Sequence, residues 1–189
     1  NQGGAPTGGP TITVTGPNVD QFSPPFLTDC GAALLPLATC EVRVRYAPTA
    51  LGSHTATASV SASPGGTTNA SLFGQGVNPA ALSVNPSSLP FPGITLIGDT
   101  SPSLSYTVTN HGGGATGLLS IIKSGTAANE FNIVGTTCST LAPGGTCIVT
   151  VAFAPAARGL RTASITVSGS PGGSVSVGVS GDALPRLEI

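Results

Sequence analysis

The sequence repeats itself at an offset of 107 to 109 residues, and this repeat limits the possible fold more than any other feature. NQGGAPTG at 1–8 aligns with NHGGGATG at 110–117, and VRVRYAPTALG at 42–52 aligns with VTVAFAPAARG at 149–159. Two shifts of one residue keep the two copies in register along the chain. Self-similarity at a fixed period indicates one folded unit that occurs in tandem.

The register of the repeat divides the chain into three parts. Residues 1–77 are expected to form a repeat that lacks its first strands, and residues 78–183 a complete repeat. Residues 184–189 resemble the start of the complete repeat and are expected to be the first strand of a further one. The stretch 79–109 has no counterpart before the first repeat.

Short runs of alternating apolar and polar residues, separated by Gly and Pro, predict an all-β fold. SPGG at 63–66 and 170–173 stands between two such runs, so it predicts a hairpin turn in which Gly supplies the positive φ. About seven short strands per repeat predict tandem immunoglobulin-like β-sandwiches. The strands of the complete repeat are expected at 80–84, 88–97 with an interruption, 103–109, 116–123, 129–134, 146–153, 161–168 and 174–181.

The four cysteines form one pair in each repeat, Cys30 with Cys40 and Cys138 with Cys147. Their spacing is far from the C-x₂₋₄-C of zinc sites and from redox C-x-x-C. The two histidines have no histidine counterpart in the other repeat, so a repeated metal site cannot use them. One disulfide in each repeat is therefore predicted, together with an oxidising compartment. Closing a loop of this length contributes about 2.5–3 kcal/mol.

Several spaced features of the complete repeat resemble a known family. They are NHGGG at 110–114, FNIV at 131–134, LAPGGTC at 141–147, VTVAFAP at 149–155 and VSVGVSG at 175–181. Together they resemble the bacterial choice-of-anchor D repeats, which are related to the ASPM/SPD-2/Hydin and major-sperm-protein-like immunoglobulin-like domains. The resemblance implies tandem sandwiches in exported, surface-attached bacterial proteins, and it implies no catalytic residues.

Charged residues are scarce, and this scarcity excludes several classes of partner. Asp, Glu, Lys and Arg make up 7% of the residues, and the net charge is −1. The chain has no basic cluster, so nucleic-acid binding is not expected. No apolar run reaches the roughly 18 residues of a membrane helix, so no membrane insertion is expected within this stretch. So little surface charge suits a protein packed against copies of itself or one tethered to a surface.

The residues that could carry chemistry are few and scattered. No nucleophile elbow of the G-x-S-x-G type occurs, and the acids form no calcium-binding group. His54 is expected to be exposed at the start of a strand. Lys123, the only lysine, could take part in an isopeptide bond in one repeat only. We therefore predict no enzyme activity and no cofactor.

The sequence leaves two kinds of surface site possible. Asn69 lies in the only N-x-S/T sequon with a permitted middle residue, beside a turn, so it is a possible glycosylation site. An adhesin or carbohydrate-binding module would need exposed aromatic residues. Phe26 and Phe91, both flanked by prolines, are the only aromatics expected to be exposed.

The leading hypothesis is a non-enzymatic extracellular stalk or filament subunit of a bacterial surface that associates with itself. The short G-V-N-P and G-D-A-L-P junctions limit bending between sandwiches. If Asn1 is a true terminus, the first sandwich has an open groove that a strand of another chain could fill. The candidate inter-subunit strand is PRLEI, made up of Pro185, Arg186, Leu187, Glu188 and Ile189. A cut from a longer array is the alternative explanation, and a natural mass near 18.3 kDa would favour the true terminus.

Overall fold

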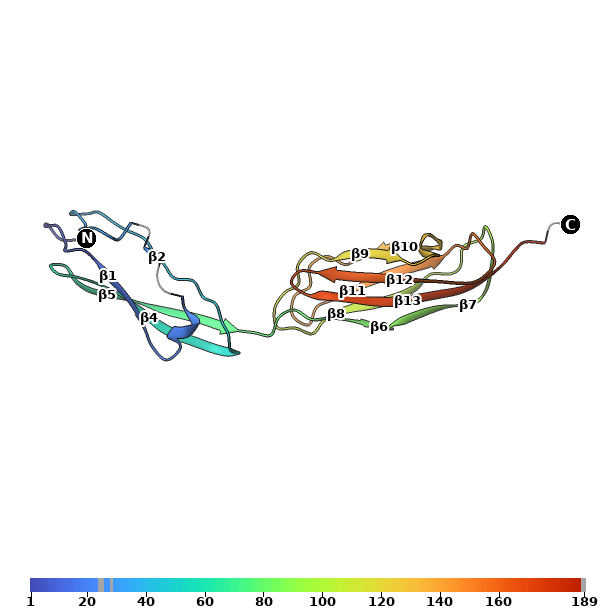
Figure 1. The fold of residues 1–189 in the computed structure, drawn as a ribbon, viewed down its shortest axis with the longest axis horizontal. Helices are drawn as coiled ribbons and strands as arrows, with labels where there is room; N and C mark the ends of the chain where they lie inside the picture. Colours follow the sequence, from blue (N-terminus) through green and yellow to red (C-terminus); the bar gives the residue numbers. More distant parts are fainter. Residues whose placement is uncertain (24–25, 28, 188–189) are drawn as a thin grey trace. The chain divides into compact units, whose positions relative to one another are not determined.

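The computed structural model describes residues 1–187 except 24, 25 and 28, and residues 26 and 27 by their backbone alone. The chain divides into two compact units, residues 1–77 and 78–189 (Figure 1). Both units are built almost wholly of antiparallel strands. In the second unit a pair of sheets packs face to face, so the chain has the predicted fold of immunoglobulin-like β-sandwiches with one disulfide in each unit.

The second unit is a complete two-sheet sandwich. One sheet has the order β10-β11-β8-β6 and the other the order β7-β13-β12-β9. All neighbouring strands run antiparallel except β7 and β13, which are parallel. The strands are β6 (Leu82–Asn85), β7 (Ser88–Leu96), β8 (Leu104–Asn110), β9 (Ser120–Ser124), β10 (Phe131–Thr136), β11 (Thr146–Phe153), β12 (Gly159–Gly169) and β13 (Gly173–Leu184), with a 3₁₀ turn η2 (Ala128–Glu130) before β10.

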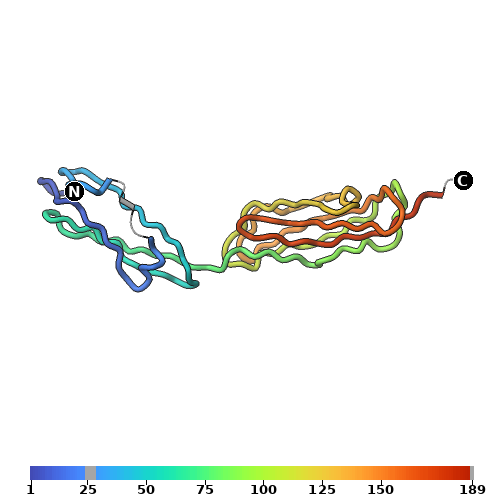
Figure 2. Tube along the Cα trace, in the orientation of Figure 1, coloured from blue at the N-terminus to red at the C-terminus, as the bar shows by residue number. Residues whose placement is uncertain are grey.

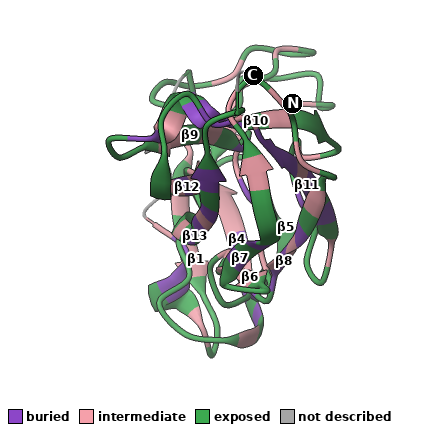
Figure 3. Ribbon diagram, turned by 90° about the vertical axis from the view of Figure 1, so that its right-hand side faces the viewer, coloured by how far each residue is buried: buried purple, intermediate pink, exposed green. Residues whose placement is uncertain are grey.

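The core of the second unit lies between its two sheets. Along β13 and the second half of β12, buried positions alternate with exposed or partly exposed ones (Figure 3), so every second side chain points inward. The inward face is aliphatic with a small group of rings. Its fully buried members include Tyr106, Val108, Phe131, Val149, Val151, Phe153, Ile165, Val167 and Val177.

The first unit contains counterparts of only part of this sandwich. A sheet of order β1-β4-β5 corresponds to β9-β12-β13, and the short pair β2-β3 corresponds to β10-β11. Figure 2 follows the chain from β1 through the loop that carries β2 and β3 to the long β4–β5 hairpin. The bounds are β1 (Thr11–Thr15), η1 (Val19–Gln21), β2 (Phe26–Leu27), β3 (Val42–Arg43), β4 (Gly52–Ala62) and β5 (Gly66–Gly76). Within the described part of this unit, no strand corresponds to β6, β7 or β8.

The SPGG segments form the predicted hairpin turns. They connect β4 to β5 and β12 to β13, and Gly65 and Gly172 have φ of 142° and 137°. The expected strand 116–123 is partly wrong, because β9 begins only at Ser120. The residues before it form a loop in which the Thr116 hydroxyl accepts a hydrogen bond from the Leu141 backbone N–H.

The outer face of each long hairpin consists mainly of hydroxyl-bearing residues. In the first unit, Thr13 of β1 pairs with Ser59 of β4, which pairs with Asn69 of β5. In the second unit, Thr166 of β12 pairs with Ser176 of β13, and their hydroxyls share a hydrogen bond of 2.9 Å. The alternation that buries one face therefore leaves serine and threonine, rather than charged residues, on the other.

Candidate functional site: an uncovered groove in the first unit

An apolar groove opens beside the β4–β5 hairpin of the first unit. It has a volume of about 260 Å³ and lies between β3 and the hairpin. Its lining comprises Val42, Val44, Ala58, Val60, Thr68, Asn69, Ala70 and Leu72. Most of these side chains are aliphatic, and several are partly exposed.

The repeat shows that this groove is a sandwich core without its cover. Val42, Val44 and Val60 align with Val149, Val151 and Val167, all of which are fully buried in the second unit. There the cover is supplied by the buried side chains of β7 and β8, namely Leu89, Phe91, Tyr106 and Val108. The first unit has the floor of the same core and, in its described part, nothing that corresponds to this cover.

The strand edges beside the groove are also free. Within the residues that the structure describes, β5 pairs only with β4, and β3 pairs only with β2. The corresponding strands of the second unit have a partner on each side, because β13 also pairs with β7 and β11 also pairs with β8. The groove therefore combines apolar walls with two backbone edges able to accept further strands.

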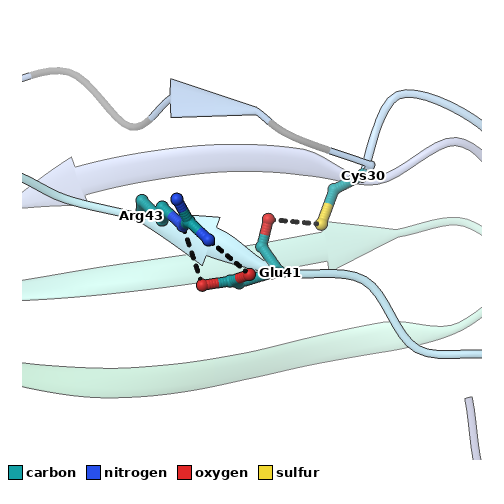
Figure 4. A network of polar contacts seen from close by, with 3 residues as sticks. All are labelled: Cys30, Glu41 and Arg43. Atoms are coloured by element: carbon teal, nitrogen blue, oxygen red, sulfur yellow. Dashed lines mark hydrogen bonds and ion pairs between the residues drawn. The ribbon is translucent and has the colours of Figure 1, made fainter.

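The predicted disulfides are both present. Cys30 and Cys40 are joined, as are Cys138 and Cys147, and no free cysteine is found in the described chain. The Cys30 sulfur lies 3.5 Å from the backbone oxygen of Glu41 (Figure 4). A disulfide sulfur has no proton, so this contact is a close approach rather than a hydrogen bond.

The alternation after Cys40 predicts that Glu41, Arg43 and Arg45 form an outward strand face, and this face varies between the repeats, with Ile148, Thr150 and Ala152 at the aligned positions. In the first unit the prediction holds, and Glu41 and Arg43 form an exposed ion pair of 2.8 Å (Figure 4). An exposed pair of this kind contributes little to stability. In the second unit Ile148 is exposed, but Ala152 is buried and departs from the prediction.

One asparagine in each repeat ties the loops at one end of its unit. The buried side-chain amide of Asn110 donates to the backbone oxygens of Gly114 and Leu141, and its oxygen accepts from the Gly112 N–H. Asn1 makes the same three bonds in the first unit, to Ala5, Leu34 and Gly3. The shared N-x-G pattern is thus a structural tie between loops.

His54 is buried, so the prediction that it is exposed is wrong. Only 4% of its surface is accessible, and its Nδ1 shares a 2.7 Å hydrogen bond with the Tyr46 hydroxyl. In the second unit the aligned Arg161 instead forms an ion pair with the buried carboxylate of Glu130, at 2.7 Å. The hydrogen bond that the Arg161 guanidinium donates to the Glu130 carboxylate holds the pKa of Arg161 above its ordinary value. The same place in the fold is filled by two different polar pairs.

The expectation that Phe91 is exposed is also wrong. Phe91 is buried against the rings of Phe131 and Phe153, with centroids 5.9 Å from each. Phe73, which the sequence did not single out, is 76% exposed on the outer face of β5. The side chain of Phe26 lies outside the described residues.

The remaining candidate residues belong to different units. Asn69 is exposed on β5. Pro185, Arg186 and Leu187 follow the end of β13, and the Arg186 guanidinium pairs with Asp99. Leu187 is 94% exposed. Glu188 and Ile189, the end of the candidate inter-subunit strand, lie outside the described residues.

Side chains that could together hold a metal ion do not gather in the described structure. His, Cys, Asp and Glu side chains nowhere form a group of three that could hold a metal ion in the described ranges. A hollow of about 420 Å³ beside Gly65 has no Asp, Glu, Lys, Arg or His side chain in its lining. No helix among the described residues has the length and apolar character needed to cross a membrane.

No family model and no curated protein matches the chain. Among solved structures, a protein of unknown function from Porphyromonas gingivalis is 15% identical, with a TM-score of 0.45 over 90% of this chain and 84% of that one. A PapD-like domain of human CEP192 is 19% identical, with a TM-score of 0.42 over 56% of this chain and 87% of the domain. The secreted serine protease VesC of Vibrio cholerae is 21% identical, with a TM-score of 0.42 over 57% of this chain and 24% of the protease. All three are likenesses of fold at low sequence identity.

Proposed function

We propose that this chain is a non-enzymatic structural part of a repeat array on the outside of a bacterial cell. The observation that supports this proposal is the set of features that the two repeats share. Both keep the disulfide, the loop-tying asparagine and the hairpin turn, whereas the polar pair at His54 and Arg161 differs. Features that maintain a scaffold are repeated, and no repeated set of reactive side chains accompanies them in the described chain.

The cysteine pairs support a location outside the reducing cytosol, because disulfides persist in oxidising compartments. The resemblance to choice-of-anchor D repeats supports a bacterial surface in particular. Short junctions that contain proline favour a linear array over a flexible string. Association between chains would extend the array.

Small-angle X-ray scattering tests the array. We would measure a recombinant chain that carries several copies of residues 78–183 in series, joined by their own junctions. The maximum dimension should grow in proportion to the number of copies. A compact particle, or the weaker growth of a freely jointed chain, would contradict the proposal. Electron microscopy of native material should show filaments or stalks.

The alternative function is that of an adhesin or carbohydrate-binding module. The observation that favours it is Phe73, an exposed ring on a sheet face rich in hydroxyl groups. Aromatic rings of this kind serve as platforms for sugars. Glycan-array binding by the whole chain that is lost in Phe73→Ser, the residue found at the aligned position 180, would favour this function over the first.

A further inference from the structure

We propose that the free edge of β1 pairs with the same edge of a second copy of this chain, in antiparallel orientation. The strand has the sequence TITVT. The contact would join two first units through one continuous sheet of order β5-β4-β1-β1-β4-β5, in which the second half belongs to the second copy. The inference rests on the proposed structural role and names the surface through which chains would associate.

The free edge of β1 belongs to the fold of the complete repeat. Among the described residues, β1 pairs only with β4, and its counterpart β9 pairs only with β12. The second unit has two four-stranded sheets, and β9 still lies at an edge. The edge of β1 is therefore free with or without counterparts of β6, β7 and β8 beside the first unit, and it is separate from the uncovered groove.

Each edge strand of the second unit has a feature that hinders pairing with another chain. Proteins commonly protect a strand edge by a short strand, a proline, a β-bulge or a charge that points inward. β6 is only four residues long, and β7 contains Pro90 and Pro92. β10 has a bulge between Ile133 and Gly135. The remaining edge strand, β9, uses a charge.

The charge on β9 is that of Lys123. It lies on the same side of the strand as Ile121, which packs against the core, so Lys123 points inward. It pairs with the fully buried Ile165 of β12. A strand added beside β9 would cover the Lys123 ammonium and remove its charge from water, which costs free energy unless the charge is paired.

The corresponding strand of the first unit, β1, has none of these features. Val14 aligns with Lys123, and the ladder of β1 with β4 runs from Thr11 to Thr15 without a bulge. Three of its five residues are threonine, and the others are isoleucine and valine. All five are β-branched and favour strands, and neither a charge nor a proline interrupts them.

The sequence of β1 is complementary to itself, which identifies a second copy as the partner. Pro10 and Pro17 flank the strand, and proline donates no ladder hydrogen bond, so the pairing is limited to the strand itself. A two-fold axis through Thr13 places Ile12 opposite Val14 of the second copy on the inner side. On the outer side threonines lie opposite threonines, and such cross-strand pairs stabilise an antiparallel sheet.

Disulfide trapping tests the contact with the whole chain. In Thr13→Cys the new thiols of two paired copies would face each other at the two-fold axis. Their Cβ atoms would be about 4.5–5.5 Å apart, which a small shift brings within disulfide range. A contact of five residues is small, so trapping under mild oxidation detects it even where no lasting dimer forms. We expect a linked dimer, and non-reducing electrophoresis measures the rate of its formation.

Matched cysteines separate edge pairing from other contacts. Ser59→Cys lies beside Thr13 on the middle strand β4 and would link only if sheets stacked face to face. Ile122→Cys occupies the aligned position on β9. Both should link roughly tenfold more slowly than Thr13→Cys. Thr11→Cys alone should also link slowly, whereas a mixture of Thr11→Cys and Thr15→Cys should link, because the two-fold register places these residues opposite each other.

An exchange of residues between the two edges tests the role of the lysine. Val14→Lys, added to Thr13→Cys, should slow the linkage roughly tenfold, because pairing would then bury a charge. Lys123→Val, added to Ile122→Cys, should speed the linkage of the second unit. Because Lys123→Val introduces the residue found at the aligned position in the first unit, it stays informative if Val14→Lys fails to fold.

Three results would overturn the proposal. They are equal rates of linkage for Thr13→Cys and Ser59→Cys, self-linkage of Thr11→Cys as fast as that of Thr13→Cys, and unchanged rates in both lysine exchanges. The multi-repeat chain used for scattering consists of residues 78–183 and contains no β1. Failure of this contact and failure of the array are therefore distinguishable.

Discussion

Leu37 adopts a backbone conformation that its side chain disfavours. Its φ is 66°, and the aligned Gly144 has a φ of 71°. Both residues donate their backbone N–H to the carbonyl of the loop-tying asparagine, Asn1 or Asn110. The hydrogen bond therefore dictates the conformation in both repeats, and only the second has the residue that adopts it without steric cost.

Leu37→Gly should stabilise the first unit. Glycine removes the steric cost of the left-handed conformation, although it also adds entropy to the unfolded chain. The net gain in the free energy of unfolding should be about 0.5–1 kcal/mol. Because Leu37 is 84% exposed, little packing is lost. Calorimetric melting of the whole chain measures the change, and Gly144→Leu should lower the stability of the second unit. A lower melting temperature in Leu37→Gly would contradict this account.

Tyr106 makes the second unit sensitive to alkaline pH. Its ring is 1% exposed, and its hydroxyl has no hydrogen-bond partner among the described protein groups. Burial raises the pKa of Tyr106 to about 12, from about 10 in the unfolded chain. The folded state therefore disfavours tyrosinate. The contribution of Tyr106 to the free energy of unfolding is fully present below about pH 10 and is lost as the pH rises from about 10 to 12.

Tyr106→Phe should remove this part of the pH dependence. It should also raise the free energy of unfolding near neutral pH by about 1 kcal/mol, because a buried hydroxyl without a partner is removed. Chemical unfolding of the parent and the variant, at about pH 7 and about pH 11, measures both effects. A parallel fall in the stability of the two proteins would assign the alkaline sensitivity to other groups.

At the scale of strands, an aromatic ring lies directly on a glycine in each unit. A Cβ added to Gly181 of β13 would collide with the ring of Phe153, and one added to Gly74 of β5 would collide with Tyr46. The glycine at this position is therefore required by the ring that packs over it.

Gly181→Ala should destabilise the second unit by about 1–3 kcal/mol, because the Phe153 ring has to move out of a packed core. Gly178→Ala provides the matched control on the same strand, since its added Cβ would have no atom within 4 Å. Urea unfolding of the two variants gives the comparison. Equal effects would mean that strand propensity, rather than the ring, sets the requirement for glycine.

The elements were predictable from the sequence to the extent that they depend on local pattern. Alternation of apolar and polar residues placed β11 at its observed bounds, and the repeat identified the paired cysteines. His54 was misjudged because its partner is a hydroxyl on another segment, which periodicity does not show. Phe91 was misjudged because its flanking prolines indicate an edge strand, and β7 is an edge strand whose ring nevertheless points inward.

The groove could be predicted only with the strand topology in addition to the sequence. The repeat indicated that opening strands have no counterpart in the first unit, but it could not say which of them pair with which. Only the strand order shows that β8 lies between β11 and β6, and that β7 runs parallel to β13.

At the scale of the molecule, the two units should differ in how readily they open. β13 is flanked by strands on both sides, whereas β5 has a described partner on one side only. Hydrogen exchange followed by mass spectrometry should show faster exchange in residues 66–76 than in residues 173–184, because amides at an open edge lack a bonding partner. Equal protection of the two hairpins would indicate that the edge of β5 is covered in solution.

The hydroxyl-lined outer faces have a consequence for the medium in which such a protein can work. Dissolved salt weakens proteins that depend on exposed ion pairs, because mobile ions screen charges over about 3 Å at 1 M and about 30 Å at 0.01 M. Serine and threonine hydrate through neutral hydrogen bonds, on which this screening does not act. The melting temperature should change by no more than ~2 °C across that range of sodium chloride, so fresh water and brine would serve this scaffold equally well.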